Sequence, residues 1–174
     1  MLFRSCAFEW CDSLTNITIP ENVTSFRDAP YSYSAGLKTA GPIGSGANIE
    51  FGWTTFIPSR AFHNSRDLIS ITIPDSVKYI GNYTFCFCTG LTSITIPDNV
   101  TTIGSGAFYG CENLNTIYLE NGIETIEEQA FNNVPGPLTV YFYGTQNEWN
   151  RIDIKDNNDV FRNANVIYAK RDHI

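Results

Sequence analysis

The chain lacks several features that would point directly to a function. None of its 174 residues belongs to an apolar run near the roughly 18 residues that a membrane-spanning helix needs. Its opening sequence MLFRSCAFEWC lacks the basic start and apolar run of a signal peptide. It has 11 Lys and Arg against 18 Asp and Glu, a net charge of −7. Because nucleic acids and anionic membranes attract clustered basic residues, neither is expected as a partner.

Groups for catalysis are also scarce. The only histidines are His63 and His173, and we expect the first to be a surface turn residue. Without a histidine near a candidate serine or cysteine, nucleophilic catalysis has no support. The glycines of GPIGSGA, which begins at Gly41, lack the Lys-Ser/Thr ending of a phosphate-binding loop and predict a flexible turn. We therefore predict that the protein is not an enzyme and binds no cofactor.

What the sequence does contain is an internal repeat. Phenylalanine recurs with a 23-residue period, at Phe62, Phe85, Phe108 and Phe131. The phrase LISITIPDSVKYIG recurs in step with it, as LTSITIPDNVTTIG and then as LNTIYLENGIETIE. A fixed period of this length is typical of a stacked solenoid.

Each repeat predicts three short pieces of structure. Ile94 and Ile96 alternate with polar residues over 93–96, which favours a half-buried strand. A Pro-Asp-Asn sequence then ends the strand, because proline cannot donate a hydrogen bond to a sheet. A second apolar segment follows at 100–103, and the spacing within 107–111 predicts a helical or 3₁₀ turn that packs its Phe inward. No coil could bury its apolar side alone, so the coils must stack with parallel strands.

We predict one mostly β solenoid domain, 1–174, of about seven coils. Regular repeats occupy 61–143, a degenerate coil with a loop insertion occupies about 27–60, and an atypical C-terminal cap occupies about 144–174. The loop is expected near 28–37, where it carries Tyr31 and Tyr33. Further strands are expected at 48–51, where Ile49 precedes Ile71 by almost one period, at 138–143 and at 165–168.

Three of the five cysteines share one repeat position. Cys11, Cys88 and Cys111 each follow the repeat Phe by three residues, and Ser65 and Val134 occupy this position in other units. A position that accepts Cys, Ser or Val is a small core position, so free buried thiols are expected. A Cys88–Cys111 bridge between neighbouring coils is the alternative. Cys6 and Cys86 lie outside this column, and no C-x-x-C pair is present to suggest zinc.

The repeat resembles the BspA-like leucine-rich repeat family. The pattern A-F-x-x-C-x-x-L-x-x-I-x-I-P-x-x-V-x-x-I-G is clearest from Thr84 to Gly104, with Thr84 in place of the Ala. AGPIGSGANIEFGW at 40–53 and YGTQNEWNRI at 143–152 are similar to segments of bacterial members. The resemblance implies a right-handed leucine-rich-repeat superhelix and a secreted or cell-surface protein. Some members are adhesins that bind host matrix proteins, and the family contributes no catalytic residues.

The outward strand positions are the candidate binding surface. This face changes from small hydroxyl residues, including Thr72 and Thr95, to Tyr118 and Tyr141 toward the C-terminus. Tyrosine is favoured at recognition surfaces because it combines apolar area with a polar tip. We therefore predict a protein-binding patch at Tyr118, Tyr141 and Tyr143, with Thr95 and Thr72 on the same face. The alternative is a ladder of β-forming residues that only stabilises the sheet.

Other interpretations remain open. The module could be a structural spacer of a larger surface protein, or it could bind glycans by stacking Tyr118 and Tyr141 on sugar rings. Asp153, Asp156 and Asp159 could hold calcium, although their spacing does not match an EF-hand. The acidic residues that cluster across one coil, Glu120, Glu124, Glu127 and Glu128, are expected to form a solvated face. The N-terminal coil has no evident cap in this sequence, so it could self-associate through an uncovered strand edge.

Overall fold

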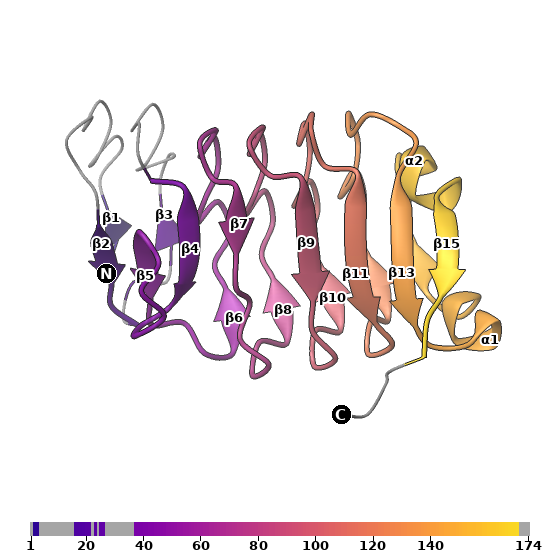
Figure 1. Cartoon of the computed structure of the whole chain (residues 1–174), viewed down its shortest axis with the longest axis horizontal. Helices are drawn as coiled ribbons and strands as arrows, with labels where there is room; N and C mark the ends of the chain where they lie inside the picture. Colours follow the sequence, from indigo (N-terminus) through magenta and orange to yellow (C-terminus); the bar gives the residue numbers. More distant parts are fainter. Residues whose placement is uncertain (1, 4–15, 22, 24, 27–36, 171–174) are drawn as a thin grey trace.

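The chain winds into a rod of stacked coils (Figure 1). A computed structural model describes residues 2–3, 16–21, 23, 25–26 and 37–170. Along one side of the rod lies the main sheet, which consists of two hydrogen-bonded groups of four parallel strands. In spatial order these are β2 (Ile17–Ile19), β5 (Ile49–Phe51), β4 (Thr39–Pro42) and β7 (Ser70–Ile71), then β9 (Ser93–Ile96), β11 (Thr116–Glu120), β13 (Thr139–Tyr143) and β15 (Asn165–Tyr168). The prediction of a repeat solenoid with short parallel strands is confirmed.

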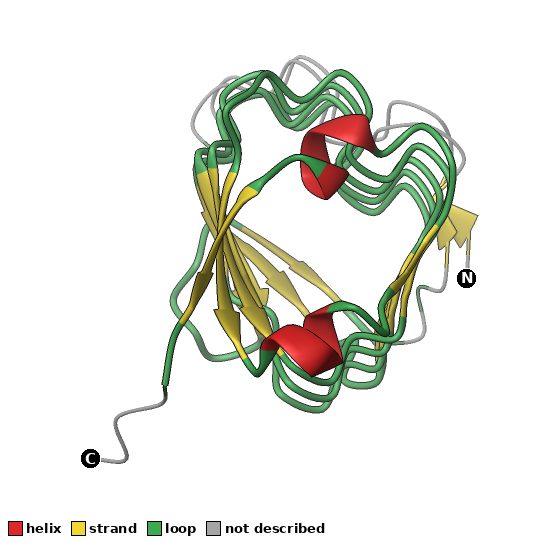
Figure 2. Cartoon of the chain, turned by 90° about the vertical axis from the view of Figure 1, so that its right-hand side faces the viewer, coloured by secondary structure: helices red, strands yellow, loops and turns green. Residues whose placement is uncertain are grey.

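A second, narrower sheet lies opposite the main sheet. Its five parallel strands are β6 (Phe56–Ile57), β8 (Tyr79–Ile80), β10 (Thr102–Ile103), β12 (Thr125–Ile126) and β14 (Asp153–Ile154). A separate parallel pair joins β1 (Leu2–Phe3) to β3 (Ser25–Phe26). Viewed along the rod, the two sheets form opposite walls and the turns close the outline between them (Figure 2). The sequence predicted the apolar return segment at 100–103, but not that such segments pair into a sheet of their own.

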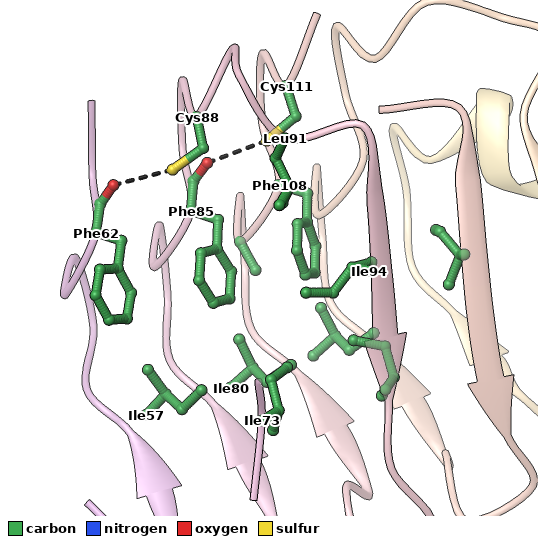
Figure 3. Close-up of a cluster of buried hydrophobic side chains, with 14 of the residues drawn as sticks. Ile57, Phe62, Ile73, Ile80, Phe85, Cys88, Leu91, Ile94, Phe108 and Cys111 are labelled. Carbon is green, nitrogen blue, oxygen red and sulfur yellow. Dashed lines mark hydrogen bonds between the residues drawn. The ribbon is translucent and has the colours of Figure 1, made fainter. Parts of the chain in front are cut away.

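The repeated phenylalanines form a continuous stack in the core. Their ring centroids are 5.5 Å apart for Phe62–Phe85, 5.2 Å for Phe85–Phe108 and 5.1 Å for Phe108–Phe131, and all four side chains are fully buried. Figure 3 shows the rings of Phe62, Phe85 and Phe108 in a row from left to right. Phe161 extends the stack, 4.8 Å from Phe131. Each aromatic pair adds about 0.5–1.5 kcal/mol beyond its buried area, so the stack helps to hold each coil to the next.

The segments that carry these phenylalanines are turns rather than helices. Their N–H groups donate to carbonyls three residues earlier, as in Ala61 to Pro58 at 3.2 Å and Cys88 to Phe85 at 3.0 Å. Of the two turn types that the sequence predicted, helical or 3₁₀, these hydrogen bonds have the 3₁₀ spacing. It cannot propagate because left-handed residues with φ between 55° and 67° recur four residues apart. These are Arg60 and Asn64, Tyr83 and Phe87, Gly106 and Gly110, and Gln129 and Asn133.

The degenerate coil contributes two strands in reversed spatial order. The sequence suggested that Ile49 would lie next to Ile71, but Ala40 of β4 pairs with Ile71, and Ile49 lies one strand further away. The GPIGSGA segment is therefore not entirely a turn, because its Gly41 and Pro42 belong to β4. The predicted loop at 28–37, with Tyr31 and Tyr33, lies almost entirely outside the described residues.

Only six residues separate β4 from β5, although parallel neighbours usually need a crossover of a dozen or more. Asn48 ties this connection back to the start of β4. Its Oδ1 accepts a hydrogen bond from the Lys38 N–H at 3.1 Å, and its own N–H donates to Thr39 Oγ1 at 3.0 Å. Gly44 and Gly46 are both left-handed there, with φ of 89° and 75°, which allows the tight return.

After Tyr143 the 23-residue period ends, but the chain still extends both sheets. Two short helices, α1 (Gln146–Trp149) and α2 (Asp159–Arg162), replace the usual turns. β14 pairs with β12 in the narrow sheet, and β15 pairs with β13 in the main sheet. The strand predicted at 165–168 is confirmed as β15. The unequal spacing from Phe131 to Phe161 explains why the sequence pattern did not include this coil in the repeat.

A buried asparagine completes the backbone hydrogen bonds at this end. In three earlier coils the repeat Phe N–H donates to a carbonyl of the next coil, at Thr84, Ala107 or Ala130. At Phe131 the acceptor is instead Oδ1 of Asn158, at 2.9 Å. The amide Nδ2 of Asn158 donates to the Glu127 and Lys155 carbonyls at 2.9 and 3.0 Å. The side chain therefore takes the position that the backbone of another coil would occupy.

Candidate functional site

The outer face of the main sheet carries a row of large side chains near its C-terminal end. Strand register aligns Thr95, Tyr118, Tyr141 and Ile167 across β9, β11, β13 and β15. The rings of Tyr118 and Tyr141 stack with centroids 5.2 Å apart and an interplanar angle of 13°. Tyr118 is 36% exposed, Ile167 is 39% exposed, and Tyr141 between them is half-buried. We call Tyr118, Tyr141 and Ile167 the tyrosine row.

The structure brings four of the five predicted residues close together. Thr95 is exposed and lies directly beside Tyr118, and Tyr143 lies two residues beyond Tyr141 on the same face. Thr72 lies just after β7, which belongs to the other hydrogen-bonded group, and its N–H donates to the Ala40 carbonyl at 2.8 Å. Thr72 is exposed, but it is separated from the tyrosine row by the strand that carries Thr95.

A groove adjoins this row at the carboxyl ends of the strands. Its volume is about 730 Å³, and it is lined by Glu120, Asn121, Tyr143, Gly144, Thr145, Tyr168, Ala169 and Lys170. Glu120 and Tyr143 are register partners, so their side chains lie side by side on the outer face. Tyr168 is 43% exposed, and its ring meets Phe142 edge-on at 6.3 Å. Among these lining residues, Tyr143 is the one that the sequence pattern predicts for this surface.

Hydrogen bonds hold the floor of the groove in place. Glu148 in α1 accepts from the Thr145 N–H at 2.7 Å and from Asn121 Nδ2 at 3.2 Å. The Thr145 hydroxyl in turn accepts from the Glu148 N–H, which completes a capping box. These hydrogen bonds, those from Thr145 first, lower the pKa of Glu148. The ionised form of Glu148 is therefore favoured by its hydrogen bonds to Thr145 and Asn121, two residues that line the groove.

A second hollow, about 420 Å³, lies at the edge of the narrow sheet and is lined mainly by acidic residues. They are Glu127, Glu128, Asp153 and Asp156, with Lys155 and Ile154 between them. Lys155 forms an ion pair with Asp153. Asp159 forms a separate ion pair with Arg162, with 3.7 Å between its carboxylate oxygen and the guanidinium nitrogen. No group of three or more His, Cys, Asp or Glu within the described ranges is arranged to hold a metal ion. The described structure therefore does not support the calcium interpretation of Asp153, Asp156 and Asp159.

The described cysteines are core residues. Cys86, Cys88 and Cys111 are free and buried, so the bridge alternative is wrong. The thiols of Cys88 and Cys111 donate to the carbonyls of Phe62 and Phe85 at 3.0 and 3.1 Å (Figure 3). Burial raises the pKa of Cys111 to about 12 and that of Cys88 well above its usual value. Because reactive cysteines need a low pKa and solvent access, neither suits a nucleophile. Cys6 and Cys11 lie outside the described residues.

A ridge of aromatic residues that the sequence pattern did not predict lies on the turns that carry the repeated phenylalanines. On the turn side of the rod, the Phe87 ring lies edge-on between His63 at 6.2 Å and Tyr109 at 5.5 Å. Asn133 Nδ2 donates to the Tyr109 hydroxyl at 2.7 Å, so this ridge is tied to the next coil. The repeat indicates only part of this ridge, because His63 and Tyr109 come one residue after the repeat Phe, whereas Phe87 comes two residues after it. His63 therefore packs in an aromatic ridge, and His173 lies outside the described residues.

Comparison with known families agrees with the repeat geometry. The family model described as "BspA type Leucine rich repeat region" matches six copies, over residues 2–42 and 55–164. The chain belongs to the BspA-type leucine-rich repeat family. No curated protein sequence is similar enough to count as a relative. No helix in the described part of this BspA-type chain is long and apolar enough to cross a membrane.

Two solved bacterial structures share the fold of this BspA-type protein. A leucine-rich cell surface protein from Faecalibacterium prausnitzii A2-165 is 24% identical, with a TM-score of 0.62 over 80% of this chain. The matched part is only 35% of that protein's length. The T. pallidum leucine-rich repeat protein is also 24% identical, with a TM-score of 0.58, and the match covers 98% of this chain and 80% of that one. At this identity the likeness shows the solenoid fold.

Proposed function

We propose that this protein is a non-catalytic, adhesin-like module that binds a protein partner through the C-terminal half of the main sheet's outer face. The observation that supports this most strongly is the tyrosine row, in which Tyr118 and Ile167 are exposed and Tyr141 is half-buried, beside a groove of about 730 Å³. Large exposed apolar and aromatic side chains that lie together are typical of protein-binding surfaces. The partner class is an extracellular protein, such as a host matrix protein, and the protein acts at the cell surface or after secretion. The F. prausnitzii neighbour is described as a cell surface protein, which supports this location.

The ring geometry favours a protein partner over a glycan. Tyr118 and Tyr141 use one face each against the other, and their remaining faces are turned toward Thr95 and Ile167 in neighbouring strands. Sugar rings need an open aromatic face, whereas a protein surface can pack on ring edges and accept hydrogen bonds from the hydroxyls. A purely structural spacer remains the second candidate, because stacked tyrosines also stabilise neighbouring strands.

Binding to a panel of extracellular matrix proteins, measured by biolayer interferometry, tests the proposal. The protein would be compared with a Tyr118→Ser/Tyr141→Ser double variant. Truncating a central aromatic anchor commonly costs about 1–2 kcal/mol or more, so we expect the variant to bind at least tenfold more weakly. Thr72→Ala should have little effect, because Thr72 lies outside the tyrosine row.

A matched control comes from the opposite sheet. Phe56 and Tyr79 are register partners on the narrow sheet, and Phe56 is 38% exposed. The Phe56→Ser/Tyr79→Ser variant therefore removes two neighbouring aromatic residues from the other side of the rod, and should bind like the unmodified protein. Equal loss in both variants would indicate damage to the fold or non-specific adhesion. If the folded protein bound no member of the panel, the spacer function would be favoured.

Self-association remains a separate proposal. We propose that the N-terminal coil pairs with the same coil of a second copy, which would form dimers. Light-scattering mass measured across a concentration series tests this, and a constant monomer mass would count against it. Residues 4–15, on which this proposal depends, lie outside the described part of the chain.

A further inference from the structure

We propose that the outer edge of β15 pairs with the same strand of a second copy, so that two rods join at their C-terminal ends in an antiparallel, twofold-symmetric dimer. Three features of this strand support the proposal. They are its open backbone groups, the arrangement of its side chains about Ile167, and the absence of charge along the segment.

The backbone of β15 offers hydrogen-bonding groups on its outer side. Within the described ranges, β15 is the last strand of its group, at the C-terminal end of the rod (Figure 1). The N–H groups of Asn165 and Ala169 donate to carbonyls on the β13 side, at 2.8 and 2.9 Å. Because the direction of these groups alternates along a parallel strand, Val166 and Tyr168 direct theirs away from β13. Such an edge readily pairs with another strand.

A second copy in antiparallel orientation matches these groups. Val166 and Tyr168 lie on either side of Ile167, so a twofold axis at Ile167 places Val166 of each copy opposite Tyr168 of the other. Each of these pairs can exchange both of its backbone hydrogen bonds. Antiparallel edge strands are common on otherwise parallel sheets. A twofold arrangement also closes after two copies, whereas head-to-tail pairing would continue into a filament.

The side chains are complementary in the same register. Ile167 is exposed on the outer face, next to Tyr141. Its two copies would meet at the axis as a non-hydrogen-bonded pair, the type in which side chains lie closer together. On the inner face, Tyr168 is exposed although its register partner Phe142 is fully buried. Tyr168 would pack against Val166 of the other copy, and aromatic and β-branched side chains are favourable cross-strand neighbours.

The charge of the segment favours a second copy over a charged foreign segment. Charged residues and proline commonly protect the edges of sheets, but residues 163–169, NANVIYA, include neither. The chain as a whole has a net charge of −7. Two copies can therefore approach along this neutral segment without placing like charges directly opposite each other, which would oppose the pairing.

Pairing would also enlarge the candidate binding surface. The aligned residues Thr95, Tyr118, Tyr141 and Ile167 would continue across the axis into the same residues of the second copy. If this surface binds a protein as proposed above, the dimer presents two linked sites, which raises the apparent affinity for a partner that repeats its binding motif. This consequence rests on the proposed function, whereas the pairing itself does not.

The mass of the whole chain in solution tests the pairing. One short strand pair gives a small interface, and small interfaces are weak, so we expect the light-scattering mass to rise from monomer toward dimer at about 10–500 μM protein. Ile167→Lys places two ammonium groups opposite each other at the axis and should weaken dimerisation about tenfold or more. Ile69→Lys makes the same change at another exposed isoleucine, next to β7, and should leave dimerisation unchanged. Circular dichroism checks that each variant is folded.

A cysteine at the axis tests the register. The two Cα atoms of a non-hydrogen-bonded antiparallel pair lie about 4.5 Å apart, within the range that a disulfide spans. With oxidised glutathione as the oxidant, Ile167→Cys should give a dimer whose disulfide joins two peptides that contain position 167, as read by mass mapping. Asn165→Cys changes the same face of the same strand, but its two copies would lie about 13 Å apart along the strands and should not cross-link.

The outcomes distinguish this pairing from other associations. A constant monomer mass up to about 500 μM would overturn the proposal. A dimer that survives Ile167→Lys and forms no cross-link at position 167 would also overturn it, and would indicate another interface such as the N-terminal coil. Equal cross-linking of Asn165→Cys and Ile167→Cys would indicate random collision and overturn the register. No matrix protein is needed for these measurements, so failure of the pairing and failure of the proposed function are observed separately.

Discussion

Replacing Asn158 should destabilise the C-terminal end of the solenoid more strongly than replacing the exposed polar residues around it. Its side chain is fully buried, accepts from the Phe131 N–H, and donates to the carbonyls of Glu127, Lys155 and Asp156. The three carbonyls each keep another donor in the structure, namely the N–H of Ala130, Arg162 Nη2 and the N–H of Gln129. The uncompensated loss in Asn158→Ala is therefore the buried Phe131 N–H.

The expected magnitude follows from that loss. A buried unsatisfied donor costs about 1–3 kcal/mol, and the small cavity left by the amide adds to it. We expect Asn158→Ala to lower the free energy of unfolding by about 3 kcal/mol, or the midpoint of thermal unfolding by about 6–12 °C for a chain of this size. Because repeat proteins couple mainly to their nearest neighbours, amide exchange should accelerate at Phe131 more than at Phe85.

Two further variants separate the causes. Asn158→Asp keeps an acceptor for Phe131 but turns a carboxylate toward three carbonyl oxygens, so it should cost at least as much as Asn158→Ala at neutral pH. Asn147→Ala changes an exposed position in α1 and should alter stability by less than about 0.5 kcal/mol. Urea unfolding followed by circular dichroism measures all three. The role assigned to the Asn158 amide would be refuted by a stable Asn158→Asp protein, or by an Asn158→Ala loss as small as that of an ordinary surface substitution.

Two other predictions concern the repeat core. Cys88 and Cys111 should resist alkylation by iodoacetamide in the folded protein and react fully in concentrated urea, as read by peptide mass mapping. Burial raises the pKa of Cys111 from 9.0 to about 12. The stability that comes from burying the neutral thiol is therefore complete below pH 9 and is lost as the pH rises toward 12. A free energy of unfolding that stays constant from pH 9 to 12 would contradict this. Gly106→Ala should destabilise the fold by about 1–3 kcal/mol, because its Cβ would collide with the Tyr83 ring, whereas Gly44→Ala, with similar left-handed backbone but open space, should cost less. Differential scanning calorimetry compares the two, and equal losses would indicate that backbone conformation alone decides.

Periodicity determined which parts of the fold could be predicted. Phe62, Phe85, Phe108 and Phe131 recur at equal spacing, so their stacking followed directly from the 23-residue period. Phe161 belongs to the same stack but comes more than one period after Phe131, since α1 and β14 occupy the intervening chain. Near-equal spacing gave one wrong strand neighbour, in the degenerate coil. Ile49 precedes Ile71 by almost one period, but a short Gly-rich return places β4 between their strands.

In the candidate site, the residues within the repeat could be predicted from the sequence and those after it could not. The period aligns Tyr118 with Tyr141, and alternation along the strand predicts that both point outward. The groove could not be predicted, because Tyr168 and Lys170 come from the segment where the repeat has ended. The residues with left-handed backbone could not be predicted either, because Arg60, Tyr83 and Gln129 occupy a conformation usually associated with glycine.

Because the Asn158 amide accepts a backbone hydrogen bond from the preceding coil, the final coil can follow a solenoid with a different number of repeats. The amide receives the Phe131 N–H as Ala130 receives that of Phe108, so the final coil fits any unit that presents the same backbone geometry. Duplicating one 23-residue unit ahead of it would lengthen the rod by one strand spacing, about 4.8 Å, and leave both ends unchanged. Gene duplication can therefore change how far the C-terminal surface stands from the N-terminal end while that surface itself stays the same.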